Sequence, residues 1–111
     1  MTEPYNFSNC KEADIGPLIH AIGSLGNDLV GLELGVLMGT SFMTLLHMCH
    51  NIKTLHGVDN YKPYEDCIGV PYDGTPVYSK DEKEVACHRF LAFHRIEYSG
   101  MKEKVVFHEM D

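Results

Sequence analysis

The residues best suited to chemistry form one stretch that contains two glycines and an acid. It reads Glu33-Leu34-Gly35-Val36-Leu37-Met38-Gly39-Thr40-Ser41. Gly35 permits a tight turn and leaves room for a ligand near the backbone, because it has no side chain. Gly39 allows the start of the following helix to pack near the strand, and Glu33 adds a carboxylate that can accept hydrogen bonds or face a cation. The stretch predicts a ligand-binding loop between a strand and a helix.

Two further acids follow at the ends of apolar runs. Asp59 lies 20 residues after Gly39 and closes the second run, and Asp111 closes the third. An acid at the end of a second strand is placed to accept hydrogen bonds from two ribose hydroxyls. Because open parallel sheets bind ligands at the carboxyl ends of their strands, we expect Glu33, Asp59 and Asp111 to share one edge.

Apolar residues at helical spacing predict the three helices that position this edge. They are Ile15, Leu18, Ile19 and Ile22 in the first helix, Phe42, Leu45, Leu46 and Cys49 in the second, and Cys87, Phe90, Leu91, His94 and Tyr98 in the third. The first helix falls within 10–28, with Pro17 in its first turn, where a missing N–H costs nothing. Gly26-Asn27 is expected to end it.

Polar residues before the other two helices are expected to cap them. Thr40 or Ser41 is the expected cap of the second helix. Ser79 is the expected cap of the third, with Glu82 at the capping-box position, and Ser99-Gly100 closes that helix.

Three short apolar runs predict strands at 29–36, 54–59 and 105–111. The first run is almost continuously apolar, which is typical of a strand buried on both faces of a parallel sheet. Residues 60–78 form a long loop rich in Tyr, Pro and Gly, and such loops are usually functional or disordered. Its tyrosines could form a lid over a ligand or simply pack the loop onto the body; they are Tyr61, Tyr64, Tyr72 and Tyr78.

The alternation of strands and helices predicts an α/β fold. We expect a Rossmann-like three-layer sandwich with a parallel sheet and right-handed crossovers, apparently truncated after the third strand. The chain has 111 residues and is expected to form one domain over 1–111. Its parts are a leading helix in 10–28 and a β-α-β-loop-α-β portion in 29–111.

The charge argues against some classes of partner. The net charge is −7, and the nine Lys and Arg residues form no basic run, so nucleic-acid binding is not expected. The most apolar region, 29–49, contains Glu33 and His47 and changes periodicity, so we expect no membrane span. The first residues lack the pattern of a signal peptide, and a cytoplasmic protein is expected.

The four cysteines form no Cys-x-x-Cys pair. Cys49 and Cys87 fall on apolar helix faces, so we expect buried free thiols and no disulfide. Zinc bound by His47, Cys49 and His50 is conceivable. Because His47 and His50 share a helix face and Cys49 points away from it, no metal is expected.

The glycine stretch and the acid after the second run resemble a known family. Glu33-x-Gly35-x-x-x-Gly39 after a first strand, followed by Asp59, is similar to the cofactor signature of class I S-adenosylmethionine-dependent methyltransferases. The full string from Glu33 to Ser41 resembles the small-molecule and sugar O-methyltransferases of that family. The resemblance covers about residues 11–111.

The resemblance implies a binding site for S-adenosylmethionine. It implies that Gly35 and Gly39 lie beneath the methionine part and that Asp59 holds the ribose. It also implies that Asp111, or the adjacent Glu109-Met110 backbone, lies near the adenine, and that Glu33 sits behind the loop and orients it. The cofactor-binding set that it implies is Glu33, Gly35, Val36, Gly39, Ser41, Asp59, Asn60 and Asp111, with the catalytic residues unknown. The family's sheet has seven strands and only three are predicted here, so we expect the cofactor half of a domain, inactive in methyl transfer by itself.

Two alternatives use the same scaffold. A non-catalytic Rossmann-like module would bind a nucleotide or a partner chain, and a homo-oligomer or a missing C-terminal half could be that partner. A nicotinamide-binding fragment is the third hypothesis. A pyrophosphate needs close backbone approach at a second glycine, and Leu37 occupies that position. The spacing therefore favours S-adenosylmethionine.

Overall fold

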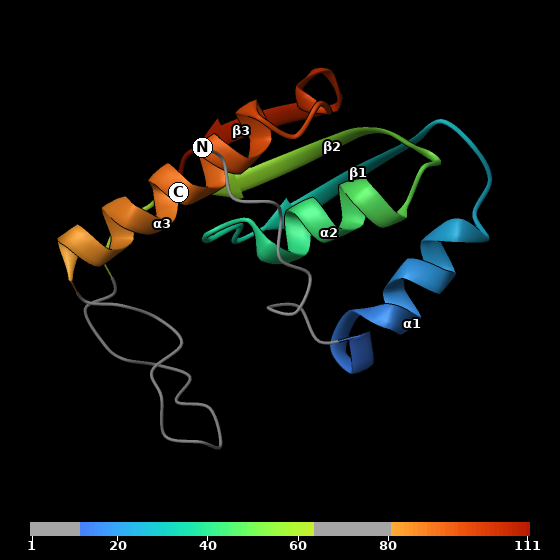
Figure 1. Cartoon of the computed structure of the whole chain (residues 1–111), viewed down its shortest axis with the longest axis horizontal. Helices are drawn as coiled ribbons and strands as arrows, with labels where there is room; N and C mark the ends of the chain where they lie inside the picture. Colours follow the sequence, from blue (N-terminus) through green and yellow to red (C-terminus); the bar gives the residue numbers. More distant parts are fainter. Residues whose placement is uncertain (1–11, 64–80) are drawn as a thin grey trace.

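The computed structural model describes residues 12–63 and 81–111. The chain forms alternating helices and strands (Figure 1). In order, they are α1 (Glu12–Gly23), β1 (Leu29–Leu34), α2 (Thr40–Met48), β2 (Ile52–Asp59), α3 (Glu82–Glu97), the short 3-10 helix η2 (Lys102–Lys104) and β3 (Val105–Glu109). The predicted strands and helices are all present, with bounds that differ by a few residues.

The three strands form one parallel sheet with the order β1-β2-β3. Leu32 of β1 pairs with His56 of β2, and His56 pairs with Val106 of β3. The carboxyl ends of the strands therefore lie at one edge, as the sequence predicts. This result confirms the α/β class and the parallel sheet.

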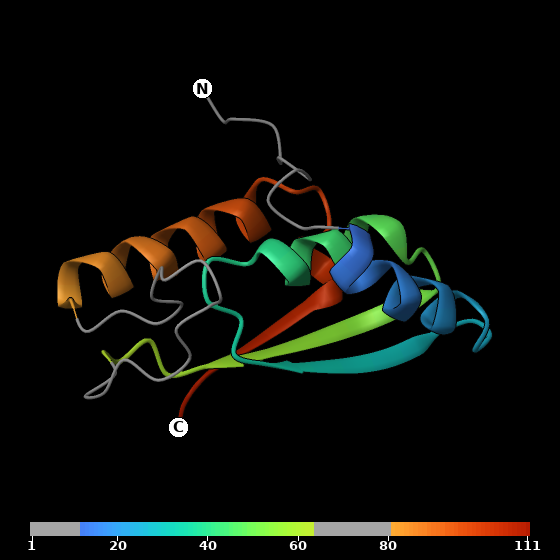
Figure 2. The same cartoon turned by 90° about the horizontal axis from the view of Figure 1, so that it is seen from below.

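All three described α-helices lie on one face of the sheet (Figure 2). Two consecutive right-handed crossovers that step in the same direction place their helices on the same side. Helix α1 packs against α2 on that side. The second helical layer expected of a three-layer sandwich is not supplied by any described helix.

The hydrophobic core lies between these helices and the covered face of the sheet. Phe42, Met43 and Leu46 of α2 are its largest fully buried side chains. Leu55 of β2 and Ala92 of α3 complete its centre. On β1 the side chains alternate between half-buried and exposed, so the expectation that this strand is buried on both faces is wrong for the described part of the chain.

Three expectations about helix ends are also wrong. Pro17 is the sixth residue of α1, because that helix begins at Glu12 and ends at Gly23. Gly39, with left-handed backbone angles and no side-chain cap, precedes α2 instead of Thr40 or Ser41. Asp81 caps α3, since its carboxylate accepts a hydrogen bond from the Lys83 N–H. Ser79 lies outside the described residues.

Helix α3 turns a different face to the core from the one predicted. Val85, Ala92 and Ile96 are buried, whereas Phe90 and Tyr98 are exposed. Cys87 is exposed, so the expected burial of this thiol is wrong, while Cys49 is buried as expected. Helix α3 has two stripes with apolar spacing. The inner stripe includes the small residue Ala92, which lies close to Gly39 at the start of α2.

No described helix has both the length and the apolar composition needed to cross a membrane.

Candidate functional site

The glycine loop between β1 and α2 is fixed by its own backbone. Gly35 donates an N–H hydrogen bond to the Val58 carbonyl at 2.8 Å, and Gly39 donates one to the Val36 carbonyl at 3.0 Å. Gly35 and Gly39 have positive φ values of 78° and 84°, which glycine adopts without steric cost. Leu37 also has a positive φ, 55°. This conformation is unfavourable for a leucine, so other contacts must hold it.

Asp59 supplies one of these contacts from the end of β2. Its Oδ2 accepts a hydrogen bond from the Leu37 N–H at 2.8 Å. Its Oδ1 accepts one from the Tyr61 N–H at 2.9 Å. The acid that the sequence predicts to face a ribose thus holds the glycine loop in this structure. Each carboxylate oxygen keeps a second lone pair that can accept another hydrogen bond.

Tyr61 holds the loop from the other side. Its hydroxyl donates a hydrogen bond to the Leu37 carbonyl at 2.6 Å, and its ring stacks on Phe107 and contacts Phe93. Burial, and then the negative charge of Asp59, raise the pKa of Tyr61 above its usual range. Tyr61 therefore stays a neutral donor at physiological pH. The sequence left open whether the loop tyrosines form a lid or pack onto the body. Tyr61 packs onto the body, and the other three lie outside the described residues.

Arg95 of α3 makes a third contact with the loop. Its guanidinium donates a hydrogen bond to the Met38 carbonyl at 2.8 Å. The sequence gives no signal for Arg95, and it indicates Tyr61 only as a loop tyrosine that could form a lid or pack onto the body. They lie 57 and 24 residues from their partners, and no local pattern signals such contacts. The one local signal is the position of Tyr61 two residues after Asp59, the acid that ends the second strand.

Glu33 lies behind the loop on the covered face of the sheet. Its Oε1 accepts a hydrogen bond from the Ser41 hydroxyl at 2.9 Å, and its Oε2 is buried with no hydrogen-bond partner among the described residues. Desolvation by burial raises the pKa of Glu33 to about 7, although the Ser41 hydrogen bond opposes the shift. A buried oxygen without a partner costs free energy, so this site has the capacity to take one more donor.

The two loop glycines have different surroundings. A Cβ atom added at Gly35 would meet nothing within 4 Å, so the space above this residue is open. A Cβ added at Gly39 would lie 3.4 Å from the Ala92 Cα, so Gly39 allows close packing against α3 and not against the strand. Val36 is buried in the core. Of these three residues, Gly35 has the space to admit a ligand.

Asn60 and Asp111 meet at the outer part of the same edge. The Asn60 side-chain amide donates a hydrogen bond to Asp111 Oδ1 at 3.2 Å, and the Lys62 ammonium binds both carboxylate oxygens at 3.2 Å. These hydrogen bonds and the charge of Lys62 lower the pKa of Asp111. The structure therefore places Asn60 and Asp111 at the same edge as Gly35 and Asp59, with Asp111 exposed and paired.

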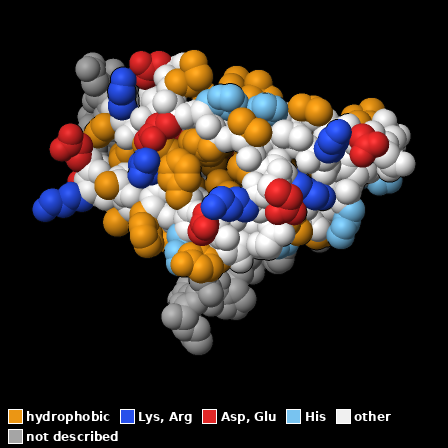
Figure 3. All heavy atoms as spheres, turned by 90° about the horizontal axis from the view of Figure 1, so that it is seen from above, with side chains coloured by type: hydrophobic (Ala, Val, Ile, Leu, Met, Phe, Trp, Pro, Cys, Tyr) orange, Lys and Arg blue, Asp and Glu red, His pale blue; other side chains and the backbone are white. Residues whose placement is uncertain are grey.

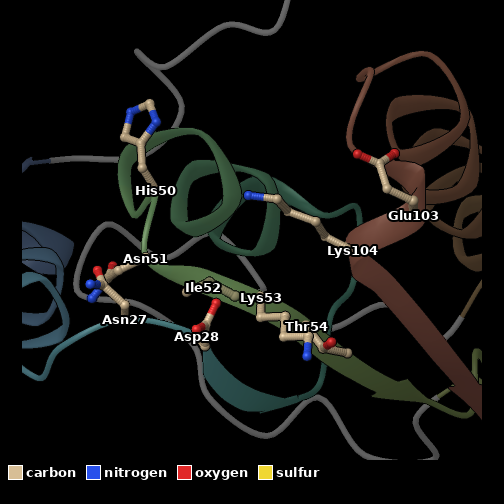
Figure 4. Close-up of a pocket in the computed structure, with 9 residues that line it drawn as sticks. All are labelled: Asn27, Asp28, His50, Asn51, Ile52, Lys53, Thr54, Glu103 and Lys104. Carbon is tan, nitrogen blue, oxygen red and sulfur yellow. The ribbon is translucent and has the colours of Figure 1, made fainter.

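A shallow hollow of about 670 Å³ lies at the opposite edge of the sheet (Figure 4). Its lining residues come from the starts of the strands and from η2; they are Asn27, Asp28, His50, Asn51, Ile52, Lys53, Thr54, Glu103 and Lys104. It contains both acids and bases and none of the predicted site residues. Because open α/β sheets bind ligands at the carboxyl ends of their strands, we place the candidate site at the glycine loop and not in this hollow.

The charged side chains of the described residues are mixed in sign. In the view of Figure 3, the Lys and Arg side chains lie beside Asp and Glu side chains and form no continuous basic stripe. Over 12–63 and 81–111, no three His, Cys, Asp or Glu side chains come together in a way that could hold a metal ion.

The residues at this edge are compatible with S-adenosylmethionine. Gly35 offers open space, Glu33 offers a buried oxygen without a described partner, and Asp59 keeps acceptor capacity at a strand end. Comparison with known proteins adds no assignment: no family model matches the chain, and no curated protein is significantly similar to it.

Proposed function

We propose that this chain binds S-adenosylmethionine at the carboxyl edge of its sheet, as the cofactor-binding half of a methyltransferase. The observation that supports the proposal best is the glycine loop, held in one conformation by Asp59, Tyr61 and Arg95. A loop that is already ordered loses little conformational freedom on binding, which favours affinity. The acceptor proposed for the methyl group is a hydroxyl of a small molecule or sugar, from the resemblance alone.

The proposed roles follow the surroundings of each residue. Gly35 would let the cofactor approach the backbone, Glu33 would accept a hydrogen bond from a donor of the cofactor, and Asp59 would accept from the ribose hydroxyls. Asn60 and Asp111 would border the adenine. The cofactor supplies an activated methyl group on a sulfonium, and the role proposed for the residues of this chain is to bind and orient it.

The test is a calorimetric titration with S-adenosylhomocysteine, with NAD as the parallel ligand. Binding of the first and not of the second is expected. Binding of NAD alone would favour the nicotinamide hypothesis. Binding of neither, by a chain that circular dichroism shows to be folded, would contradict the proposal and leave the non-catalytic module.

A matched pair of glycine variants localises the site. Gly35 and Gly100 have nearly equal φ values, 78° and 77°, and a Cβ added at either meets nothing within 4 Å. Gly35→Ala and Gly100→Ala should therefore impose similar backbone strain. We expect only Gly35→Ala to weaken binding of S-adenosylhomocysteine, because its methyl group enters the proposed site. Equal losses in both variants would place the site elsewhere.

A further inference from the structure

Strand β1 carries the most exposed apolar side chains of the sheet. Val30, Leu32 and Leu34 are 67%, 63% and 74% exposed. They point away from the helices, because the alternate residue Glu33 is bonded to Ser41 of α2 on the covered face. Figure 2 shows this strand beside β2, with no described helix on the lower face of the sheet. The apolar row therefore faces solvent in the described part of the chain.

The backbone of β1 is also open on one side. In the described sheet β1 is an edge strand that pairs with β2 alone. An edge strand presents unpaired N–H and C=O groups that can pair with another chain, and proteins usually protect such edges with Lys, Pro or inward charges. The sequence LVGLEL of β1 has no Lys or Pro, and its one inward-pointing acid, Glu33, is hydrogen-bonded to Ser41 on the covered face. The edge thus combines free backbone groups with an apolar row.

The sequence of β1 is complementary to itself in one antiparallel register. If Leu32 opposes Leu32 of a second copy, then Val30 opposes Leu34 in both directions. On the other face Gly31 opposes Glu33, so each carboxylate faces a residue without a side chain. A register centred on Glu33 would place two carboxylates opposite each other, which is unfavourable. The register centred on Leu32 pairs all three apolar side chains and separates the charges.

We propose that β1 is a self-association edge, through which two copies of this chain pair antiparallel about a two-fold axis at Leu32. The two sheets then form one six-stranded sheet. Such an interface is isologous and closed, because the same segment serves both copies. The neutral surface of β1 suits an acidic chain of net charge −7, since no acid of the row opposes its own copy.

The size of the contact sets the strength that we expect. Edge pairing brings the three aliphatic side chains of each copy beside those of the other on the same open face, so only part of their surface is buried, well below the about 800 Å² per partner of a standard stable interface. Backbone hydrogen bonds between the two strands add to this contact. A reversible dimer that dissociates on dilution is therefore expected.

The first experiment measures the mass of the chain by analytical ultracentrifugation over a hundredfold range of concentration. We expect a monomer–dimer equilibrium. Leu32→Lys should abolish the dimer, because it places two ammonium groups opposite each other at the axis. Leu25→Lys is the matched control, since Leu25 is 69% exposed and lies outside β1. A wild-type monomer at every concentration, or a dimer that survives in Leu32→Lys, would overturn the proposal.

Disulfide trapping tests the register. The cysteine variants are made in a background in which Cys10, Cys67 and Cys87 are changed to Ser. Residues directly opposite each other on antiparallel strands lie within disulfide distance. Leu32→Cys should therefore cross-link to itself. Val30→Cys alone should not, but it should cross-link to Leu34→Cys when the two chains are mixed. If Val30→Cys cross-links to itself as efficiently as Leu32→Cys does, the two-fold axis at Leu32 is contradicted. Neither readout depends on S-adenosylhomocysteine, so this proposal and the proposed function can fail separately.

Discussion

The Asp59 carboxylate accepts a hydrogen bond from the backbone N–H of Leu37 at 2.8 Å, across 22 residues of sequence. This contact joins the end of β2 to the centre of the glycine loop. Leu37 has a φ of 55°, a left-handed conformation that costs a non-glycine residue ~1–2 kcal/mol. The hydrogen bond offsets that cost and gives Asp59 a structural role in addition to the ligand role that we propose for it.

Asp59→Ala should therefore affect both stability and binding. The change leaves the N–H groups of Leu37 and Tyr61 without an acceptor, and an unsatisfied polar group costs ~1–3 kcal/mol. We expect the free energy of unfolding to fall by about 2 kcal/mol and the affinity for S-adenosylhomocysteine to fall with it. Urea unfolding and calorimetry measure the two effects. Asp111→Ala is the control for stability alone, since Asp111 is exposed and bonded only to Asn60 and Lys62 in the described structure. Unchanged stability in Asp59→Ala would show that the loop does not depend on this carboxylate.

Tyr61→Phe separates the hydroxyl from the ring. It removes the 2.6 Å hydrogen bond to the Leu37 carbonyl and keeps the ring contacts with Phe93 and Phe107. We expect a loss of about 1 kcal/mol in the free energy of unfolding and faster amide hydrogen exchange in the glycine loop. Tyr98→Phe is the matched control, because Tyr98 is exposed on α3. If both variants exchange like the wild type, the hydroxyl does not hold the loop.

Glu33 should make the stability of the chain depend on pH. Burial raises the pKa of Glu33 from its ordinary value of 4.5 to about 7 in the folded state, so folding favours the protonated form. The unfolded chain loses this proton near pH 4.5 and the folded chain near pH 7. The contribution of Glu33 to the free energy of unfolding should therefore be highest below pH 4.5 and fall by about 3 kcal/mol as the pH rises to 7, since each pKa unit corresponds to ~1.36 kcal/mol.

Glu33→Gln tests this dependence directly. Glutamine is uncharged at every pH, so the variant should lack the decline between pH 4.5 and 7 and should exceed the wild type in stability at pH 8. The other titrating groups are common to both proteins and cancel in the difference between their stability curves. Exposed Glu103→Gln is the control and should follow the wild type. Parallel curves for Glu33→Gln and the wild type would contradict the buried, protonated state of Glu33.

The sequence predicts the parts of this fold that depend on local pattern. Apolar runs and helical spacing predict β1, α2 and β2, because their buried side chains recur with the period of the element. The spacing predicts the exposed stripe of α3 as its core face, because spacing alone does not say which of two apolar faces is buried. The choice depends on the close approach of Gly39 to Ala92, which is a tertiary contact.

In the candidate site, too, local sequence pattern predicts some residues and tertiary contacts bring in the others. The sequence predicts that Glu33, Gly35 and Asp59 share one edge, because parallel strands end together. It does not predict that Tyr61 and Arg95 bind the loop, since those hydrogen bonds join segments brought together only by the folded sheet and α3.

Gly57 is a further residue whose importance appears only in the structure. A Cβ atom added here would lie 2.9 Å from side-chain atoms of both Phe42 and Val36 and 3.2 Å from Phe107. Gly57→Ala should therefore overpack the core and lower the free energy of unfolding by about 2 kcal/mol. Gly23→Ala is the control, because a Cβ there meets nothing within 4 Å. It should be neutral or stabilising, since alanine favours the helix. Thermal unfolding of the two variants measures the difference, and equal melting temperatures would contradict the tight packing around β2.

The two described cysteines should differ in reactivity. Cys87 is exposed on α3, whereas Cys49 is buried after α2, and burial raises the pKa of the Cys49 thiol. Because the thiolate is the reactive form, iodoacetamide should label Cys87 in the native chain and Cys49 only after unfolding. Mass spectrometry of tryptic peptides distinguishes these cysteines from Cys10 and Cys67. Native labelling of Cys49 at the rate of Cys87 would contradict the placement of Cys49 in the hydrophobic core.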